Sequence, residues 1–205
     1  MTATTSRPAA RLGAADLARI AVFAALIVVL GAVVVPLAGG VPVTGQTLGV
    51  MLAGTVLGAR RAPWAVLLVL VLAAVGLPVL AGGRGGLGVF VGPSAGYLLG
   101  WLAGVVVIGL IARSGAGRLQ WWRVALGCLV GGVGVVYLFG APVQALVLGT
   151  PFWPTALASL VFLPGDLIKV ALATVLTLSL ARAYPPAFGT AFRLREAAPR
   201  GIAAP

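Results

Sequence analysis

Six long apolar runs restrict the fold of this chain more than any other feature of its sequence. They cover residues 16–38, 45–59, 63–80, 94–112, 122–148 and 157–183. A helix that crosses a bilayer needs about 20 apolar residues, so most of the runs are long enough, whereas the second is short for a full crossing. The fifth run could end early, near Gly140, and the sixth is interrupted by Pro164-Gly165. The runs predict an all-α membrane protein that is a bundle of six transmembrane helices.

The low content of charged residues excludes an ordinary soluble domain. Of the 205 residues, 61% are hydrophobic and 8% are charged, whereas a soluble domain carries about 25% charged residues. A soluble protein of this length could not bury so much apolar surface. We expect a single membrane domain over residues 16–183, with flexible cytoplasmic tails rich in Ala, Pro and Arg over residues 1–15 and 184–205.

The positions of the basic residues predict the orientation of the helices. If all six runs cross the membrane, twelve of the 14 cations fall on one side: Arg7, Arg11, Arg19, Arg60, Arg61, Arg113, Arg118, Arg123, Arg182, Arg193, Arg195 and Arg200. By the positive-inside rule that side is the cytoplasm, so both termini are cytoplasmic in a multi-pass protein of a prokaryotic plasma membrane. The net charge of +11 does not indicate a nucleic-acid partner, because the basic residues are spread over short loops.

Arg84 and Lys169 are the two cations that this topology does not explain, and Asp166 lies three residues before Lys169. Charge at membrane depth is costly, so it indicates a function or a buried cavity. The spacing places Asp166 and Lys169 on one helical face, with Cβ atoms about 5–6 Å apart. They could be an ion pair that lets both charges survive burial, or a pair that binds a polar ligand. Arg84 could be an exposed loop residue or a donor to an anionic group.

Three segments on the outer side, residues 39–54, 76–101 and 137–166, are rich in Gly and Pro. Non-helical backbone at membrane depth is tolerated only where it is buried in protein or lines a cavity, so these segments predict a pocket near the outer surface. Thr44 and Gln46 either cap the second helix or line this pocket. Glycines such as Gly85 and Gly86 allow backbone to approach a ligand closely. Aromatic residues of these segments could lie in the core, in the interface belt, or against a ligand ring: Phe90, Tyr97, Trp101, Tyr137, Phe139, Trp153 and Phe162.

Three stretches in these regions resemble the BioY family, the substrate-binding components of biotin transporters of the energy-coupling-factor (ECF) type. They are "VPVTGQTLGVMLAGTVLG", "GLPVLAGGRGGLGVFVGPSAGYLLGW" and "FLPGDLIKVALA", and the resemblance extends over residues 16–183. It implies a six-helix bundle that binds biotin from outside and works with a transmembrane coupling subunit and two ABC-type ATPases. It also implies that Asp166 and Lys169 hold the polar head of biotin. From the outer segments themselves we expect Arg84, Gln46, Thr44, Gly85, Gly86 and Tyr97 as further ligand-binding residues.

Two pairs of small residues four positions apart lie at the start of the first run: Ala14 with Ala18, and Ala21 with Ala25. Such spacing lets helices pack closely in lipid. The resemblance implies that Ala21 and Ala25 form the surface that docks on the coupling subunit. Ordinary packing within the bundle remains the alternative.

The sequence offers little material for catalysis. It has no histidine and a single cysteine, Cys128, so we expect no metal and no cofactor. Its only lysine does not follow a glycine-rich phosphate loop, so active uptake would need energy from another subunit. We therefore expect a transport component and not an enzyme. The alternatives are a substrate component for another vitamin or small heterocycle, and an intramembrane enzyme that uses Asp166 and Lys169 for acid–base chemistry.

Overall fold

The computed structural model describes residues 13–35, 41–114 and 119–188, and these form six helical rods. Four rods are single helices: α1 (Ala14–Leu30), α2 (Gln46–Leu57), α3 (Ala62–Ala74) and α4 (Ala95–Ala112). The fifth rod joins α5 (Trp121–Leu129), a π-helical segment η2 (Val130–Val135) and α6 (Val136–Leu148). The sixth joins α7 (Phe152–Ala158), a 3-10 segment η3 (Ser159–Phe162) and α8 (Leu163–Ala183). The predicted six-helix bundle is confirmed.

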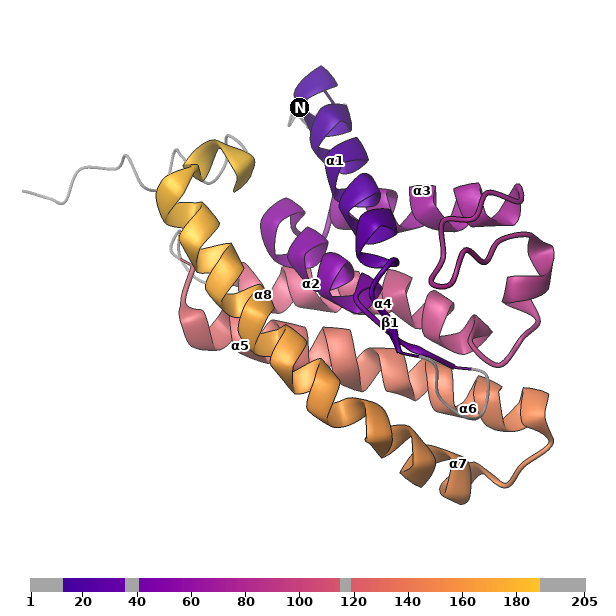
Figure 1. Ribbon diagram of the computed structural model, residues 1–205. Coiled ribbons are helices and arrows are strands. Elements are labelled where there is room, and N and C mark those ends of the chain that lie inside the picture. The colour runs from indigo at the N-terminus through magenta and orange to yellow at the C-terminus, as the bar shows by residue number, and fades with distance from the viewer. Residues whose placement is uncertain (1–12, 36–40, 115–118, 189–205) are drawn as a thin grey trace, which may run out of the picture.

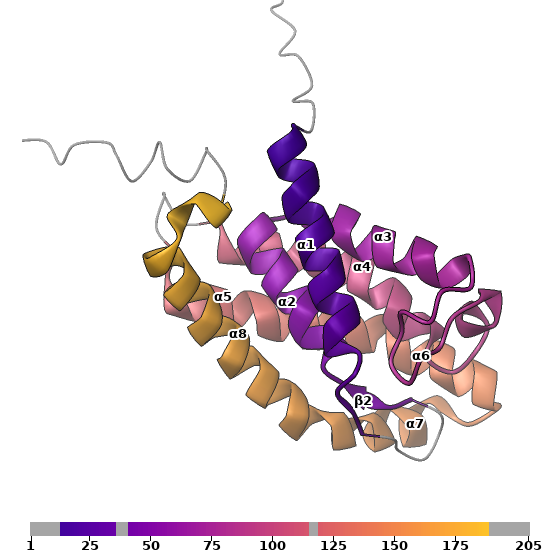
Figure 2. The same ribbon diagram turned by 45° about the horizontal axis from the view of Figure 1, so that its top comes forward.

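Helix α4 is the centre of the bundle and packs against α2, α3, α5 and α6. Helix α1 lies over α2 and α3, and α8 contacts α2 and α5 (Figures 1 and 2). Glycines allow the closest of these contacts: a Cβ on Gly131 would lie 2.6 Å from the carbonyl oxygen of Gly104 on α4. The π-helical segment therefore packs with its backbone almost directly against α4.

Three of the rods are long and apolar enough to cross a membrane: residues 95–112, 121–148 and 152–183. Helices α2 and α3 are shorter, with 12 and 13 residues. The expectation of a short second span therefore holds, and the third is also shorter than the run of residues 63–80. Helix α3 ends at Ala74, where Gly76 adopts a φ of +99° that other residues rarely adopt, and Pro78 follows.

The ends of two other runs also differ from expectation, while the fifth keeps its expected end at Leu148. Helix α1 stops at Leu30, well before residue 38, and the chain forms a short antiparallel hairpin of β1 (Val34–Val35) with β2 (Val43–Thr44). The fifth rod does not end near Gly140 but continues through Pro142 to Leu148. The sixth begins at Phe152 and changes to 3-10 geometry just before Pro164, which lies in the first turn of α8. Proline fits there because the first turn needs no N–H donor.

The remainder of the chain was expected to form tails. Residues 1–12 and 189–205 lie outside the described residues, as do 36–40 and 115–118. Two boundaries differ from those expected: α1 begins at Ala14, and a 3-10 segment η4 (Pro185–Phe188) follows α8. Phe188 at its end is 2% exposed, so this part of the predicted C-terminal tail packs on the bundle.

Basic side chains connect the helix ends at one end of the bundle. Arg19 on α1 donates to the carbonyl oxygen of Pro186 over 3.1 Å. Arg113, just after α4, donates from Nε to the carbonyl oxygen of Thr55 over 3.2 Å and from Nη2 to that of Val56, which supplies two orphan carbonyls at the end of α2 with donors. Burial, followed by the nearby charge of Arg61, lowers the pKa of Arg113 to about 10, so it stays protonated at neutral pH. These contacts connect the first turns of α1 to the segment after α8, and the end of α4 to the end of α2, at one end of the bundle.

Candidate ligand-binding site

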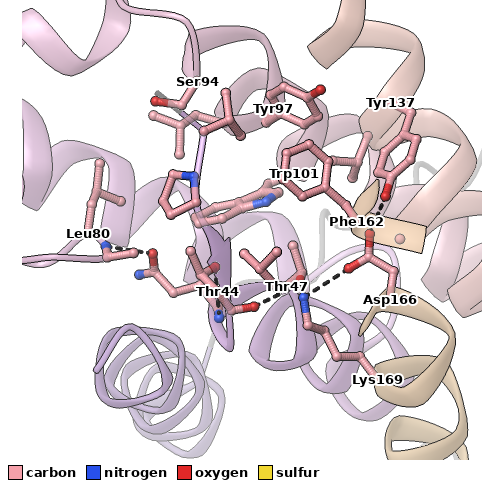
Figure 3. A pocket seen from close by; sticks show the side chains of 18 of the residues that line it. Thr44, Thr47, Leu80, Ser94, Tyr97, Trp101, Tyr137, Phe162, Asp166 and Lys169 are labelled. Atoms are coloured by element: carbon pink, nitrogen blue, oxygen red, sulfur yellow. Dashed lines mark hydrogen bonds and ion pairs between the residues drawn. The ribbon is translucent and has the colours of Figure 1, made fainter. Parts of the chain in front are cut away.

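A pocket lies at the opposite end of the bundle from these arginines, and all of the outer segments contribute to it (Figure 3). The empty space between its lining residues is about 640 Å³, a volume that includes space open to solvent. Its wall comes from the hairpin, the start of α2, the loop before α4, the start of α4, the fifth rod and the start of α8. The lining residues are Val41, Pro42, Val43, Thr44, Gln46, Thr47, Leu80, Ala81, Arg84, Ser94, Tyr97, Leu98, Trp101, Gly132, Val136, Tyr137, Phe162, Asp166 and Lys169.

The ion pair of Asp166 and Lys169 lies on the α8 side of this pocket. Lys169 Nζ is 2.9 Å from Asp166 Oδ1, and the two side chains are only 12% and 7% exposed. Asp166 is in the first turn of α8, where the helix dipole stabilises its negative charge. The two residues therefore form the expected intrahelical ion pair, and both also line the pocket.

Two residues from other helices also form hydrogen bonds with the pair. Tyr137 donates its hydroxyl to Asp166 Oδ2 over 2.5 Å, and Lys169 Nζ donates to Thr47 Oγ1 over 2.9 Å. Asp166 thus accepts on both oxygens, and Lys169 retains one N–H among its three. Thr47 is not among the site residues expected from the sequence, and for Tyr137 the sequence leaves several places open. The only signal was that both lie in the outer segments.

Thr44 and Gln46 both line the pocket, but of the two only Thr44 also forms a side-chain hydrogen bond with the start of α2. Thr44 Oγ1 accepts the backbone N–H of Gln46 over 3.3 Å at the start of α2, and both residues line the pocket. The buried Gln46 amide also bridges to the loop after α3: Nε2 donates to the carbonyl oxygen of Val79 over 3.0 Å, and Oε1 accepts the N–H of Ala81 over 2.9 Å. Gln46 therefore holds a wall of the pocket in place.

Arg84 lies at the other side of the pocket from the ion pair, half-buried in a tight turn. Its backbone pairs with that of Leu80, its Nε donates to the carbonyl oxygen of Ala81 over 3.1 Å, and its Nη1 lies 3.4 Å from Ser94 Oγ. Gly85 and Gly86 are not among the residues that line the pocket. Their backbone faces α3 instead, since the N–H of Gly86 donates to the carbonyl oxygen of Ala73 over 2.7 Å.

Aromatic rings form the deep wall of the pocket. Tyr97 packs edge-on against Tyr137 and Phe162, with ring centroids 6.2 and 6.3 Å apart. The Tyr97 hydroxyl donates to Gln144 Oε1 over 2.8 Å and lies 3.1 Å from Ser159 Oγ. These hydrogen bonds fix the position of the ring, which lines the pocket. A site of this kind can hold an apolar ring system that carries a few polar atoms.

The small residues of α1 lie away from the pocket. Ala14, Ala18, Ala21 and Ala25 are all exposed, whereas Ile20, Ala24 and Ile27 face the core. Packing within the bundle thus does not account for Ala21 and Ala25. Within the described ranges, no group of His, Cys, Asp and Glu could hold a metal ion.

Comparison with known proteins gives consistent matches over most of the chain. The model of the BioY family matches residues 2–186. A protein of Rhizobium etli named "Biotin transporter BioY" is 46% identical over 83% of this chain and 95% of its own length. A protein of the same name from Rhodobacter capsulatus is 47% identical over 82% of this chain and 94% of its own length.

A solved structure is similar in fold as well as in sequence. The crystal structure of "the S-component for biotin from an ECF-type ABC transporter" superposes with a TM-score of 0.76 and is 34% identical. The match covers 82% of this chain and 91% of that one.

Proposed function

The chain belongs to the BioY family, and on that premise we propose that it binds biotin as the substrate-specific component of an ECF-type transporter. The observation that carries the proposal is the pocket, in which a buried acid–base pair and a set of aromatic rings face one another. The names of the relatives and of the similar structure support the same ligand.

Biotin has the chemistry that this pocket can recognise. Its ureido ring offers two N–H donors and a carbonyl acceptor, its fused rings and valerate chain are apolar, and its tail is an anion. Asp166 has lone pairs left to accept a ureido N–H, and the remaining N–H of Lys169 can donate to the ligand. Tyr137 and Thr47 orient this pair through the hydrogen bonds of 2.5 and 2.9 Å.

The other end of the ligand then lies near the mouth of the pocket. Arg84 and Ser94 line that side, and a guanidinium group can bind a carboxylate through charge-assisted hydrogen bonds. We assign the valerate carboxylate to Arg84. Thr44, Gln46 and Tyr97 complete the wall, and Gly85 and Gly86 support the loop that carries Arg84 without facing the ligand.

Transport requires partners. The exposed small residues Ala21 and Ala25 form a smooth stripe on α1 that a helix of a coupling subunit can approach closely. We propose that this stripe docks on the coupling subunit, which in turn binds two ABC-type ATPases. The positive end of the bundle then faces the cytoplasm of a prokaryotic cell, and the pocket opens outward.

The same proposal makes the protein a carrier that leaves its ligand unchanged. The family and the similar structure are transport components, and Asp166 and Lys169 are hydrogen-bonded to each other, to Tyr137 and to Thr47. Mass spectrometry of biotin recovered from the purified protein tests this point. Recovery of a modified ligand would favour an enzyme.

Isothermal titration of the purified protein with biotin tests the proposed function. We expect saturable binding in the nanomolar-to-micromolar range and no competition from other vitamins. If biotin does not bind in that range, or if another vitamin displaces it, the assignment of the ligand is wrong while the fold and the pocket remain.

A further inference from the structure

One polar group in the wall of the pocket has no hydrogen-bond partner. Trp101 is 5% exposed and lines the pocket, and its Nε1–H is buried and unpaired among the described residues. Buried indole N–H groups usually find an acceptor, so an unpaired one calls for an explanation. Arg123 Nε is the other such side-chain atom in the described ranges, and it belongs to the end of the bundle that carries the basic residues, not to the pocket.

The position of Trp101 on α4 shows which part of a ligand it can reach. It follows Tyr97 by four residues, so it lies one helical turn deeper on the same face. Tyr97 packs against Tyr137, which in turn donates to Asp166. In Figure 3 Trp101 is seen near the middle of the view, between Tyr97 and Thr47. The indole therefore lies on the pocket wall next to Tyr97, which connects through Tyr137 to the acid–base pair.

We propose that Trp101 donates its indole N–H to the ureido carbonyl oxygen of biotin and so contributes to the selection of the ligand. The inference rests on the proposed function. Of the acceptors in biotin, the carboxylate belongs with Arg84 at the mouth, and the thioether sulfur is a weak acceptor. The carbonyl oxygen lies between the two ureido N–H groups and has two lone pairs, so it can accept from both Lys169 and Trp101 when a ureido N–H faces Asp166. Because Nε1 is covered by protein atoms in this structure, the bond forms with a small shift of the side chains around it.

Three ligands and two variants test which acceptor Trp101 reaches. Trp101→Phe keeps an aromatic ring but removes the donor, and Trp121→Phe is the matched control because Trp121 is 66% exposed at the opposite end of the bundle. We expect Trp101→Phe to lower the affinity for biotin about tenfold and Trp121→Phe to leave it unchanged. With desthiobiotin, which lacks the ring sulfur, Trp101→Phe should lower the affinity by the same factor relative to the wild type. A thione analogue, in which sulfur replaces the ureido oxygen, should bind equally well to the wild type and to Trp101→Phe, since its acceptor is already poor.

Each other outcome overturns the inference. If the loss disappears with desthiobiotin, the acceptor is the ring sulfur. If it persists at full size with the thione analogue, Trp101 acts through packing alone. Failure of the wild-type protein to bind biotin overturns the proposed function instead, so the two failures are distinguishable.

A measurement on the wild-type protein covers the case in which Trp101→Phe does not fold. In protein labelled with ¹⁵N at the indole nitrogens, the Trp101 N–H resonance should move downfield when biotin is added, because the proton enters a hydrogen bond. The indole resonance of Trp121 should stay in place. A Trp101 proton that does not move downfield at saturating biotin contradicts the inference.

Discussion

The two ends of the bundle carry the same local pattern, an aspartate followed three residues later by a cation on one helix. At the end that carries the arginines, Asp16 Oδ1 is 3.0 Å from Arg19 Nη1 and 3.0 Å from Arg61 Nε. At the pocket end, Asp166 pairs with Lys169 at 2.9 Å. The local spacing and the distances are almost equal, but the surroundings are not.

The difference lies in burial and in what completes the hydrogen bonding. The Asp16 and Arg19 side chains are 15% and 28% exposed, against 7% and 12% for Asp166 and Lys169. Asp16 joins α1 to the start of α3, and Arg19 ends on a backbone carbonyl. Asp166 and Lys169 instead form hydrogen bonds with hydroxyl groups of two other helices, and both line a pocket. On the function proposed above, an acid–base pair can form part of a binding site when side chains from other helices orient it beside a cavity, whereas the same pair on a more exposed helix end connects helices.

Removal of the acid at each end should give the largest contrast. Asp166→Asn weakens a charged acceptor in the pocket and leaves Lys169 without its counter-ion, so we expect the affinity for biotin to fall about 100-fold. Asp16→Asn should leave the affinity unchanged, because Asp16 has no contact with the pocket. Calorimetric titration of both variants measures this contrast. Wild-type affinity in Asp166→Asn would mean that the pair is structural only.

Removal of the cation should have a smaller effect than removal of the acid. Lys169→Met keeps the length of the side chain, and Asp166 retains the hydrogen bond from Tyr137, so we expect a loss of about 30-fold in affinity. Arg19→Met is the corresponding variant at the other end and should change only thermal stability. The melting temperature of each detergent-solubilised variant, with and without biotin, reports on both. Equal ligand-induced shifts in the two variants would contradict the distinction between the ends.

The hydroxyl that orients Asp166 can be removed alone. Tyr137→Phe keeps the ring and its edge contact with Tyr97 but removes the donor at 2.5 Å, and we expect about a tenfold loss of affinity. Tyr184→Phe, at the end of α8 and 59% exposed, is the control. An unchanged affinity in Tyr137→Phe would show that Asp166 is positioned without Tyr137.

The smallest effect is expected for Thr47. Thr47→Val removes the acceptor of one Lys169 proton and should lower the affinity about threefold, since Asp166 still holds the ammonium group. Thr55→Val is its counterpart on the same helix: it breaks a buried hydrogen bond of 2.8 Å to Thr177 away from the pocket. It should lower stability but not affinity. If Thr47→Val lowered the stability but left the affinity unchanged, Thr47 would have no part in the site.

The sequence predicts the six helices and the central pair of the site because both depend on local patterns. Apolar runs predict helices by composition, and the three-residue spacing of Asp166 and Lys169 places them on one face of a helix. Tyr137 and Thr47 escape such analysis, since they lie 29 and 122 residues from the partners they bind. Only the packing of the helices brings these side chains together.

Other differences arise because hydropathy does not mark where a helix ends. The apolar run through Leu80 hides the end of α3 at Ala74, although Gly76 and Pro78 are the usual signals of such an end. The loop after α3 then turns back, and its glycines contact α3 again. Gly85 and Gly86 therefore support the loop without lining the pocket, whereas Arg84, between the two pairs of glycines, does line it.

The short helices α2 and α3 make the pocket sensitive to the bilayer. With 12 and 13 residues, they extend about 18 and 20 Å, whereas the hydrocarbon core of a membrane is about 30 Å thick. The hairpin and the loop after α3 then account for the remaining depth. Their backbone groups need hydrogen-bond partners within the protein, and the Gln46 amide is such a partner for the carbonyl of Val79 and the N–H of Ala81. Hydrophobic mismatch on this side therefore acts on the same segments that form the mouth of the pocket. We expect the affinity for the ligand to vary with lipid chain length, which would not hold for a pocket formed by six helices of full membrane length.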